Sequence, residues 1–152
     1  MERRCFEDLT DGERLWCRDV PFTEGEIIGF ARRYDPQPFH IDPVVAERSI
    51  FGGIIASSLH TLSACTRVVV EAVGDVAILS GVGLHEAKMH APVRPGDILA
   101  VRAWWCDLRR SRSRPGRGLA SIRCEVANQR GQTVITYGYR YMVACRNATG
   151  SG

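Results

Sequence analysis

The longest helical pattern in the chain lies at Ser57 to Val73, where apolar residues occupy nearly every side of the predicted helix. At about 1.5 Å per residue, this helix would be about 25 Å long. A helix with so little polar face is normally enclosed by other elements of a fold rather than lying on its surface. We therefore expect this segment to form the central helix.

Three later segments have the pattern of β-strands: Ile98 to Leu108, Leu119 to Ala127 and Thr133 to Cys145. They are rich in β-branched and aromatic residues, and the second alternates apolar with polar positions at a period of two. Turn-forming sequences precede the first strand at 94–97 and separate the last two at 128–131. The pattern predicts an α+β fold in which a curved antiparallel sheet wraps around the central helix.

The first third of the chain predicts two further helices. Thr23 to Glu26 has the sequence of a capping box, in which the Thr23 hydroxyl accepts from a first-turn amide and Glu26 reaches back. This helix should run to about Tyr34, because the Pro-x-Pro stretch that follows cannot continue it. A short helix should then start at Asp42-Pro43, with the aspartate as N-cap and the proline in the first turn.

Length and composition favour one soluble domain. The chain has 152 residues, of which 45% are hydrophobic and 24% charged, and these values argue against disorder and coiled coils. We expect the domain to cover residues 1–146 and the tail 147–152 to be disordered. No apolar stretch approaches the roughly 20 residues of a membrane span, and the N-terminus lacks the apolar block of a secretory signal. The sequence therefore predicts a cytoplasmic protein without membrane contact.

The net charge and the spacing of cysteines and histidines argue against a nucleic-acid partner and against a metal site. The net charge of +3 is too balanced to indicate nucleic acid, which is not an expected partner. The six cysteines show no Cys-x-x-Cys spacing and are interpreted as small core residues of a reduced protein. Because the histidines also lack a metal-ligand spacing, no metal site is expected.

The segment from Phe30 to Asp42 holds the strongest candidate for chemistry. Asp35 and His40 lie on a bend that two prolines stiffen, so the backbone fixes the relation of the two side chains. General acid–base catalysis requires such a fixed arrangement, and histidine suits proton transfer at neutral pH. On spacing alone, Asp35 also fits a helix C-terminal turn, and His40 also fits a packed or surface histidine.

This segment, Phe30-Ala-Arg-Arg-Tyr-Asp-Pro-Gln-Pro-Phe-His-Ile-Asp42, resembles the signature of the MaoC-like dehydratases, the family of (R)-specific enoyl-CoA hydratases. In that family an Asp-x-Asn/Asp-Pro-x-His motif follows a short helix. Residues 49–61, 90–97 and 111–119 agree with the family in the same order. The resemblance implies the hot-dog fold and a homodimer with acyl-CoA sites at the subunit interface.

The resemblance also implies a reaction, the reversible addition of water to a trans-2-enoyl thioester. His40 would take a proton from water as general base, while Asp35 would hold that water and help to deliver a proton to the α carbon. Amides at the start of the central helix would stabilise the thioester oxygen near Ser58, which stands where relatives often have glycine. Thr66 matches a family hydroxyl that orients the aspartate, or else it bonds its own helix backbone. No cofactor is implied other than the CoA of the substrate.

Two alternative functions fit the same residues. Ser58 adds a side chain where the thioester would lie, which favours a non-catalytic acyl-CoA-binding protein as one alternative. A thioesterase of the same fold is the other, although an Asp-x-x-x-x-His spacing suits water addition better. A serine hydrolase is disfavoured because no Gly-x-Ser-x-Gly sequence is present.

The basic stretch 109–117 has three interpretations. It is a solvated loop between strands, or a nucleic-acid contact, or a site in which Arg112, Arg114 and Arg117 bind the phosphates of CoA through paired hydrogen bonds. No aromatic-interleaved motif supports nucleic acid. The carrier of the acyl group stays open, because the arginines suit either CoA phosphates or an acidic carrier protein.

Overall fold

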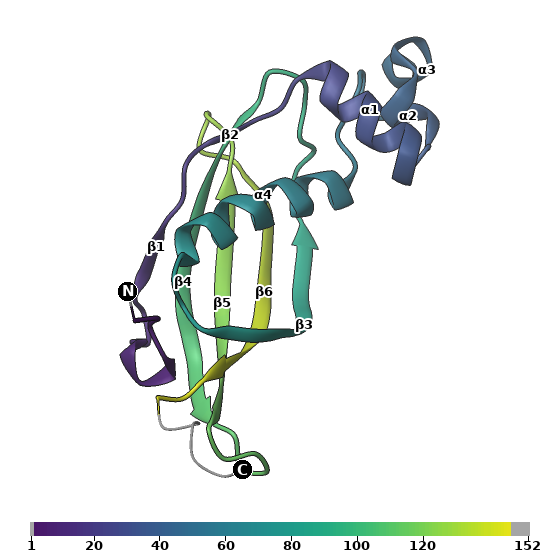
Figure 1. Ribbon diagram of the computed structural model, residues 1–152. Coiled ribbons are helices and arrows are strands. Elements are labelled where there is room, and N and C mark those ends of the chain that lie inside the picture. The colour runs from purple at the N-terminus through teal and green to yellow at the C-terminus, as the bar shows by residue number, and fades with distance from the viewer. Residues whose placement is uncertain (1, 147–152) are drawn as a thin grey trace.

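The computed structural model describes residues 2–146, so the tail predicted at 147–152 lies outside the described residues (Figure 1). Its body is a six-stranded antiparallel sheet in which the strand order is β1-β4-β5-β6-β3 and β2 pairs with β4. The strands are β1 (Arg14–Trp16), β2 (Val20–Pro21), β3 (Ile78–Met89), β4 (Ile98–Arg110), β5 (Arg117–Ala127) and β6 (Thr133–Ala144). The helices are the 3-10 turn η1 (Phe6–Asp8), α1 (Glu24–Tyr34), α2 (Pro38–Ile41), α3 (Pro43–Glu47) and α4 (Ser58–Val73).

Helix α4 crosses one face of the sheet, and the hydrophobic core lies between them (Figure 1). Along β5 the residues facing α4 are buried, as with Ile122 and Cys124, while Arg123 and Glu125 face outward. Trp105 and Tyr137 are the largest fully or almost fully buried side chains of this layer. The expected α+β arrangement of a curved antiparallel sheet around a long helix is therefore confirmed.

The helix is less enclosed than its apolar pattern predicts. Leu59 is 52% exposed and Val70 is 54% exposed, because the sheet covers only one side of α4 within a single chain. Strand β3 forms the edge of the sheet and also exposes apolar side chains, among them Leu79, Val82 and Leu84. The chain thus presents an apolar edge and an apolar helix side to its surroundings.

The short helices before α4 follow the capping chemistry of their first residues. The Thr23 hydroxyl accepts from the Glu26 amide at 3.2 Å, but the return bond from the Glu26 side chain does not occur among residues 2–146. Asp42 caps α3 as predicted, with Oδ1 accepting from the amides of Val44 and Val45. The single turn α2 was not predicted; it begins at Pro38, where the ring already has a helical φ.

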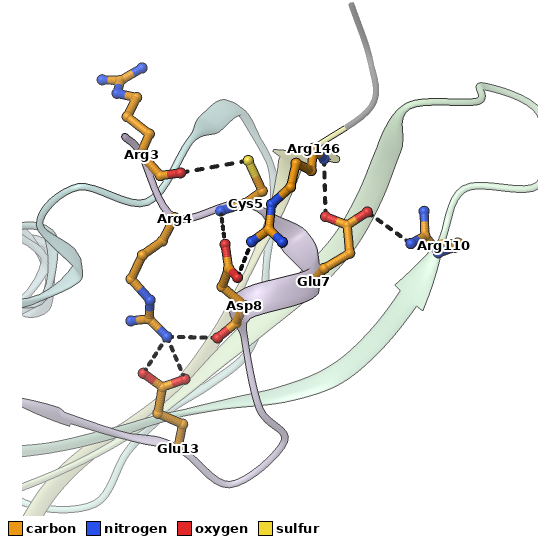
Figure 2. A network of polar contacts seen from close by, with 8 residues as sticks. All are labelled: Arg3, Arg4, Cys5, Glu7, Asp8, Glu13, Arg110 and Arg146. Atoms are coloured by element: carbon orange, nitrogen blue, oxygen red, sulfur yellow. Dashed lines mark hydrogen bonds and ion pairs between the residues drawn. The ribbon is translucent and has the colours of Figure 1, made fainter. Parts of the chain in front are cut away.

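A polar network fastens the N-terminal segment to the far end of the sheet (Figure 2). Arg4 donates to both carboxylate oxygens of Glu13, and Glu7 accepts from the Arg110 side chain at 2.8 Å. Arg146, just after β6, pairs with Asp8. These contacts tie η1 to β4 and to the end of the described chain, away from α1 and α2.

The six cysteines are free thiols, but their interpretation as small core residues is right for only three, because Cys5, Cys17 and Cys106 are partly exposed. Cys65, Cys124 and Cys145 are buried, and burial raises the pKa of the first two to about 12. A thiol with so high a pKa is not a nucleophile at neutral pH.

Within residues 2–146 no helix has the length and apolar character that crossing a bilayer requires.

Candidate active site

The bend after α1 brings the two predicted residues together. Asp35 ends α1, and its amide still donates to the Ala31 carbonyl at 2.8 Å. The turn α2 then carries His40, which is only 4% exposed. As a result, His40 Nε2 lies 3.4 Å from Asp35 Oδ2.

The other nitrogen of His40 fixes the proton arrangement of the imidazole. His40 Nδ1 lies 2.7 Å from the carbonyl oxygen of Ile55, which only accepts hydrogen bonds. Nδ1 must therefore carry the proton, and in the neutral ring Nε2 has a free lone pair. Because Nε2 is the nitrogen that faces Asp35, the ring is set to accept a proton at that side.

Ser57 connects Asp35 to the start of α4. Its hydroxyl is fully buried, donates to Asp35 Oδ2 at 2.6 Å and accepts from the Leu59 amide at 3.2 Å. Ser57 is thus the N-cap of α4 and a direct partner of the carboxylate. A hydrogen bond to a carboxylate is stronger than one between neutral groups, so Ser57 holds Asp35 firmly in place.

The surroundings of Asp35 keep it ionised. The hydrogen bond from Ser57 contributes most to lowering the pKa of Asp35, followed by one from the Gln37 side chain to Oδ1 at 2.9 Å. Partial burial opposes this shift of the pKa, and the neighbouring His40 adds to it. At neutral pH the site therefore contains a carboxylate and not a carboxylic acid.

Both side chains face a cavity of about 330 Å³. Asp35, His40 and Ser58 line it, so the structure brings these three predicted residues to one place. The remaining wall is mostly apolar and includes Ile55, Ala56, Phe51, Met89, Pro92, Val93, Val134 and Ile135. A cavity of this size and character suits a small, largely apolar ligand beside a few polar side chains.

Ser58 is the first residue of α4, where a helix leaves its amides without intrahelical acceptors. Within residues 2–146 the Ser58 amide donates no hydrogen bond to a protein acceptor. The positive end of the helix dipole lies at the same point. A negative charge that forms in the cavity near Ser58 would therefore be stabilised.

The other predicted site residues are not brought to this cavity. The Thr66 hydroxyl donates to the Leu62 carbonyl at 2.8 Å, which is the backbone alternative considered for it, and Ser57 is the hydroxyl that contacts Asp35. Arg112, Arg114 and Arg117 lie in or beside the β4–β5 turn at the opposite end of the sheet from α1 and α2 (Figure 1). Because β6 from Ile135 to Ala144 spans about 30 Å, these arginines cannot reach the cavity of their own chain.

Four polar residues of the site were not identified from the sequence, one of which is His90 in the cavity wall. Ser57 and Gln37 both bond Asp35, and Thr61 lines the cavity one turn into α4. The available signal for Ser57 was its position as the first residue of the predicted helix, since serine is a preferred N-cap. Among residues 2–146, no group of three or more His, Cys, Asp or Glu side chains is arranged to hold a metal ion.

Comparisons with known proteins place this geometry in context. The model of a family described as the MaoC like domain matches residues 6–123. The chain is 34% identical to the MaoC-like dehydratase from Rhodospirillum rubrum, with a TM-score of 0.85 over 94% of this chain and 98% of that one. It is 30% identical over 101 residues to the Protein MaoC of Klebsiella aerogenes, covering 66% of this chain and only 30% of that protein.

A more distant structure agrees in fold. The R-hydratase PhaJ1 from Pseudomonas aeruginosa is 21% identical, with a TM-score of 0.74 over 93% of this chain and 86% of that one. At this identity the likeness concerns the fold alone. The fold is the hot-dog fold.

Proposed function

The chain belongs to the MaoC-like domain family, and from this membership and the site geometry we propose that it is a hydratase or dehydratase acting on trans-2-enoyl thioesters such as enoyl-CoA. The observation that carries the proposal is the pairing of Asp35 Oδ2 with His40 Nε2 at 3.4 Å beside the cavity. Both groups face one space in which a water molecule and an acyl chain can meet.

In the direction of hydration, His40 acts first. Its Nε2 removes a proton from a water molecule that Asp35 holds, and the resulting hydroxide adds to the β carbon of the enoyl group. The Ile55 carbonyl, which accepts from Nδ1, stabilises the imidazolium that forms. This step leaves a negative charge on the thioester oxygen.

The second proton transfer completes the addition. Because Asp35 is ionised at rest, any proton that it gives to the α carbon must first come from the imidazolium, whose Nε2 lies 3.4 Å away. The proton taken from water thus reaches the α carbon, and water is added as H and OH. Dehydration is the same path in reverse.

The start of α4 supplies the stabilisation of the thioester oxygen. Ser58 lines the cavity at the positive end of the helix, where its amide would meet a developing oxyanion. Loss of one such donor in other enzymes costs about 3 kcal/mol. The start of the helix therefore contributes to the rate as much as a side chain does.

The proposal is tested by following loss of enoyl-thioester absorbance with crotonyl-CoA and longer homologues. We expect Asp35→Asn and His40→Ala to lower kcat at least 100-fold each, because each removes one part of the proton path. His85→Ala removes an imidazole on β3 outside the cavity and serves as the matched control. Full activity in both site variants would refute the mechanism.

Ser58 favours a second candidate function, a non-catalytic acyl-CoA-binding protein. Its side chain lines the cavity at the point where the thioester would approach the helix. Binding of acyl-CoA in calorimetry without hydration of any enoyl chain would support this candidate. Release of free thiol from saturated acyl-CoA would instead indicate a thioesterase.

We also propose that the chain acts as a homodimer. The edge strand β3 and the outer side of α4 expose apolar side chains, and an unpaired sheet edge of this kind is a common site of association. Met89, at the rim of the cavity, is 54% exposed and would be covered by such a partner. Sedimentation of the purified chain measures this directly, and a monomer at all concentrations would contradict it.

A further inference from the structure

The outer face of the sheet, opposite α4, carries an ordered group of arginine and tryptophan side chains near the β1 edge. Arg14 on β1 is opposite Trp104 on β4, and Trp16 is opposite Arg102, so all four point to the same face. The Arg14 guanidinium lies 4.8 Å from the centre of the Trp16 ring, and that of Arg102 lies 5.2 Å from the Trp104 ring. We call these four residues the Arg–Trp patch.

The patch is exposed and has spare positive charge. Trp16 is 79% exposed, and the side chain of Arg102 is 60% exposed. Arg14 forms no ion pair among residues 2–146, while Arg102 has only a long contact of 3.8 Å to Glu125. Stacking on the indole rings holds both guanidinium groups in place, so a partner would not have to immobilise them on binding.

The arginine and tryptophan side chains of the patch favour a protein partner, and the positive charge of the patch favours acidic side chains on that partner. Arginine and tryptophan are the residues most enriched at the energetic centres of protein interfaces. A nucleic-acid strand would need a longer positive track, but Glu125 and Glu86 interrupt the face and pair with Arg102 and Arg123. The positive area is therefore compact and lies at one edge of the sheet.

The patch is continuous with the rim of the cavity. One row of residues in register runs from Trp16 and Arg102 through Glu125 to Thr136. The Thr136 hydroxyl contacts Nε2 of His90 at 2.8 Å, and His90 also lines the cavity. Three steps between strands at about 4.8 Å each place the patch about 14 Å from this rim.

From this arrangement we propose that the Arg–Trp patch docks a small acidic carrier protein that bears the acyl group on a phosphopantetheine arm. The inference rests on the proposed function, since it names the source of the thioester for that same cavity. An extended phosphopantetheine arm is about as long as five extended residues, about 17 Å. It would therefore span the outer face from the patch to the rim at His90.

The test compares two substrates that share the crotonyl thioester, crotonyl-CoA and crotonyl-loaded acidic acyl-carrier protein. For each enzyme variant the ratio of kcat/KM with the carrier protein to kcat/KM with CoA is measured. We expect the double variant R14E/R102E to lower this ratio at least tenfold at low salt, with a smaller loss at high salt. As a control, R109E makes half of this charge change near the far end of β4 and should leave the ratio as it is.

The outcomes separate this proposal from the proposed function. If wild type hydrates crotonyl-CoA but not the carrier substrate, or if the double variant keeps the wild-type ratio, the docking proposal is wrong and the hydratase proposal stands. If neither substrate is hydrated, the hydratase proposal fails, and calorimetry of wild type with the carrier protein then decides the docking. Oligo-dT binding that R14E/R102E abolishes, with an unchanged substrate ratio, would assign the patch to nucleic acid instead.

Discussion

Removal of the Ser57 hydroxyl should damage the site through Asp35. This hydroxyl is fully buried and donates to the carboxylate at 2.6 Å, and hydrogen bonds to charged groups contribute about 1.5–3 kcal/mol. If that energy is lost from the transition state, kcat falls roughly 10- to 100-fold. The same change raises the pKa of Asp35, because the largest of the effects that lower it has been removed.

Ser57 also caps α4, so the variant must separate catalysis from helix stability. Replacing an N-cap serine with alanine costs about 1 kcal/mol of stability, whereas replacing it with glycine costs only a few tenths. Both Ser57→Ala and Ser57→Gly remove the donor to Asp35. We therefore expect similar losses in kcat from the two variants, because both lose the bond to Asp35. The unfolding free energy should fall in both, and further in Ser57→Ala, because alanine also loses most of the capping energy.

The assay is kcat with crotonyl-CoA, together with a ¹³C NMR titration of the aspartate carboxyls. In wild type the pKa of Asp35 is lowered in the folded state, so its contribution to stability is present above the unfolded pKa and disappears as pH falls through the folded pKa. The stability difference between wild type and Ser57→Gly should shrink in the same acidic range. Unchanged kcat and an unchanged Asp35 titration in the glycine variant would refute the positioning role of Ser57.

Two further substitutions test the packing and the cavity. Gly118→Ala would place a Cβ atom 2.2 Å from the Phe6 ring and should lower the unfolding free energy, measured in urea, by about 1–3 kcal/mol. As the control, Gly25→Ala in α1 meets nothing within 4 Å and should not destabilise the protein. Equal unfolding midpoints for the two variants would contradict this. Ser58→Gly keeps the amide and removes a side chain from the cavity lining, so kcat/KM for crotonyl-CoA should rise about threefold or more. A fall in kcat/KM would show instead that the Ser58 hydroxyl assists the reaction.

Long segments with one clear period were predictable from the sequence. Helix α4 and strands β4, β5 and β6 fall within a few residues of their predicted limits, because each buries one face against the same core. Strand β3 was missed. Its residues lack alternation because most of them are exposed in the single chain, and three irregularities interrupt its pairing with β6.

The candidate site was predictable only where neighbours in the sequence form it. Two prolines fix the short bend between Asp35 and His40, so their proximity follows from local geometry. The contact of Asp35 with Ser57 joins residues 22 positions apart, and no local pattern indicates it. The position of the arginines at 109–117 relative to the cavity depends on the strand order, because successive turns of an antiparallel sheet lie at alternate ends of it.

The residues of the candidate site lie at the ends of helices, and they depend on one another. Asp35 ends α1, His40 lies in the turn α2, and Ser57 precedes α4. One hydroxyl both holds the Asp35 carboxylate and caps α4. Under the proposed mechanism, a change at Ser57 should therefore alter proton transfer and charge stabilisation together. Changes at η1 or at the β4–β5 turn, at the other end of the sheet, should alter stability without changing the geometry of Asp35 and His40.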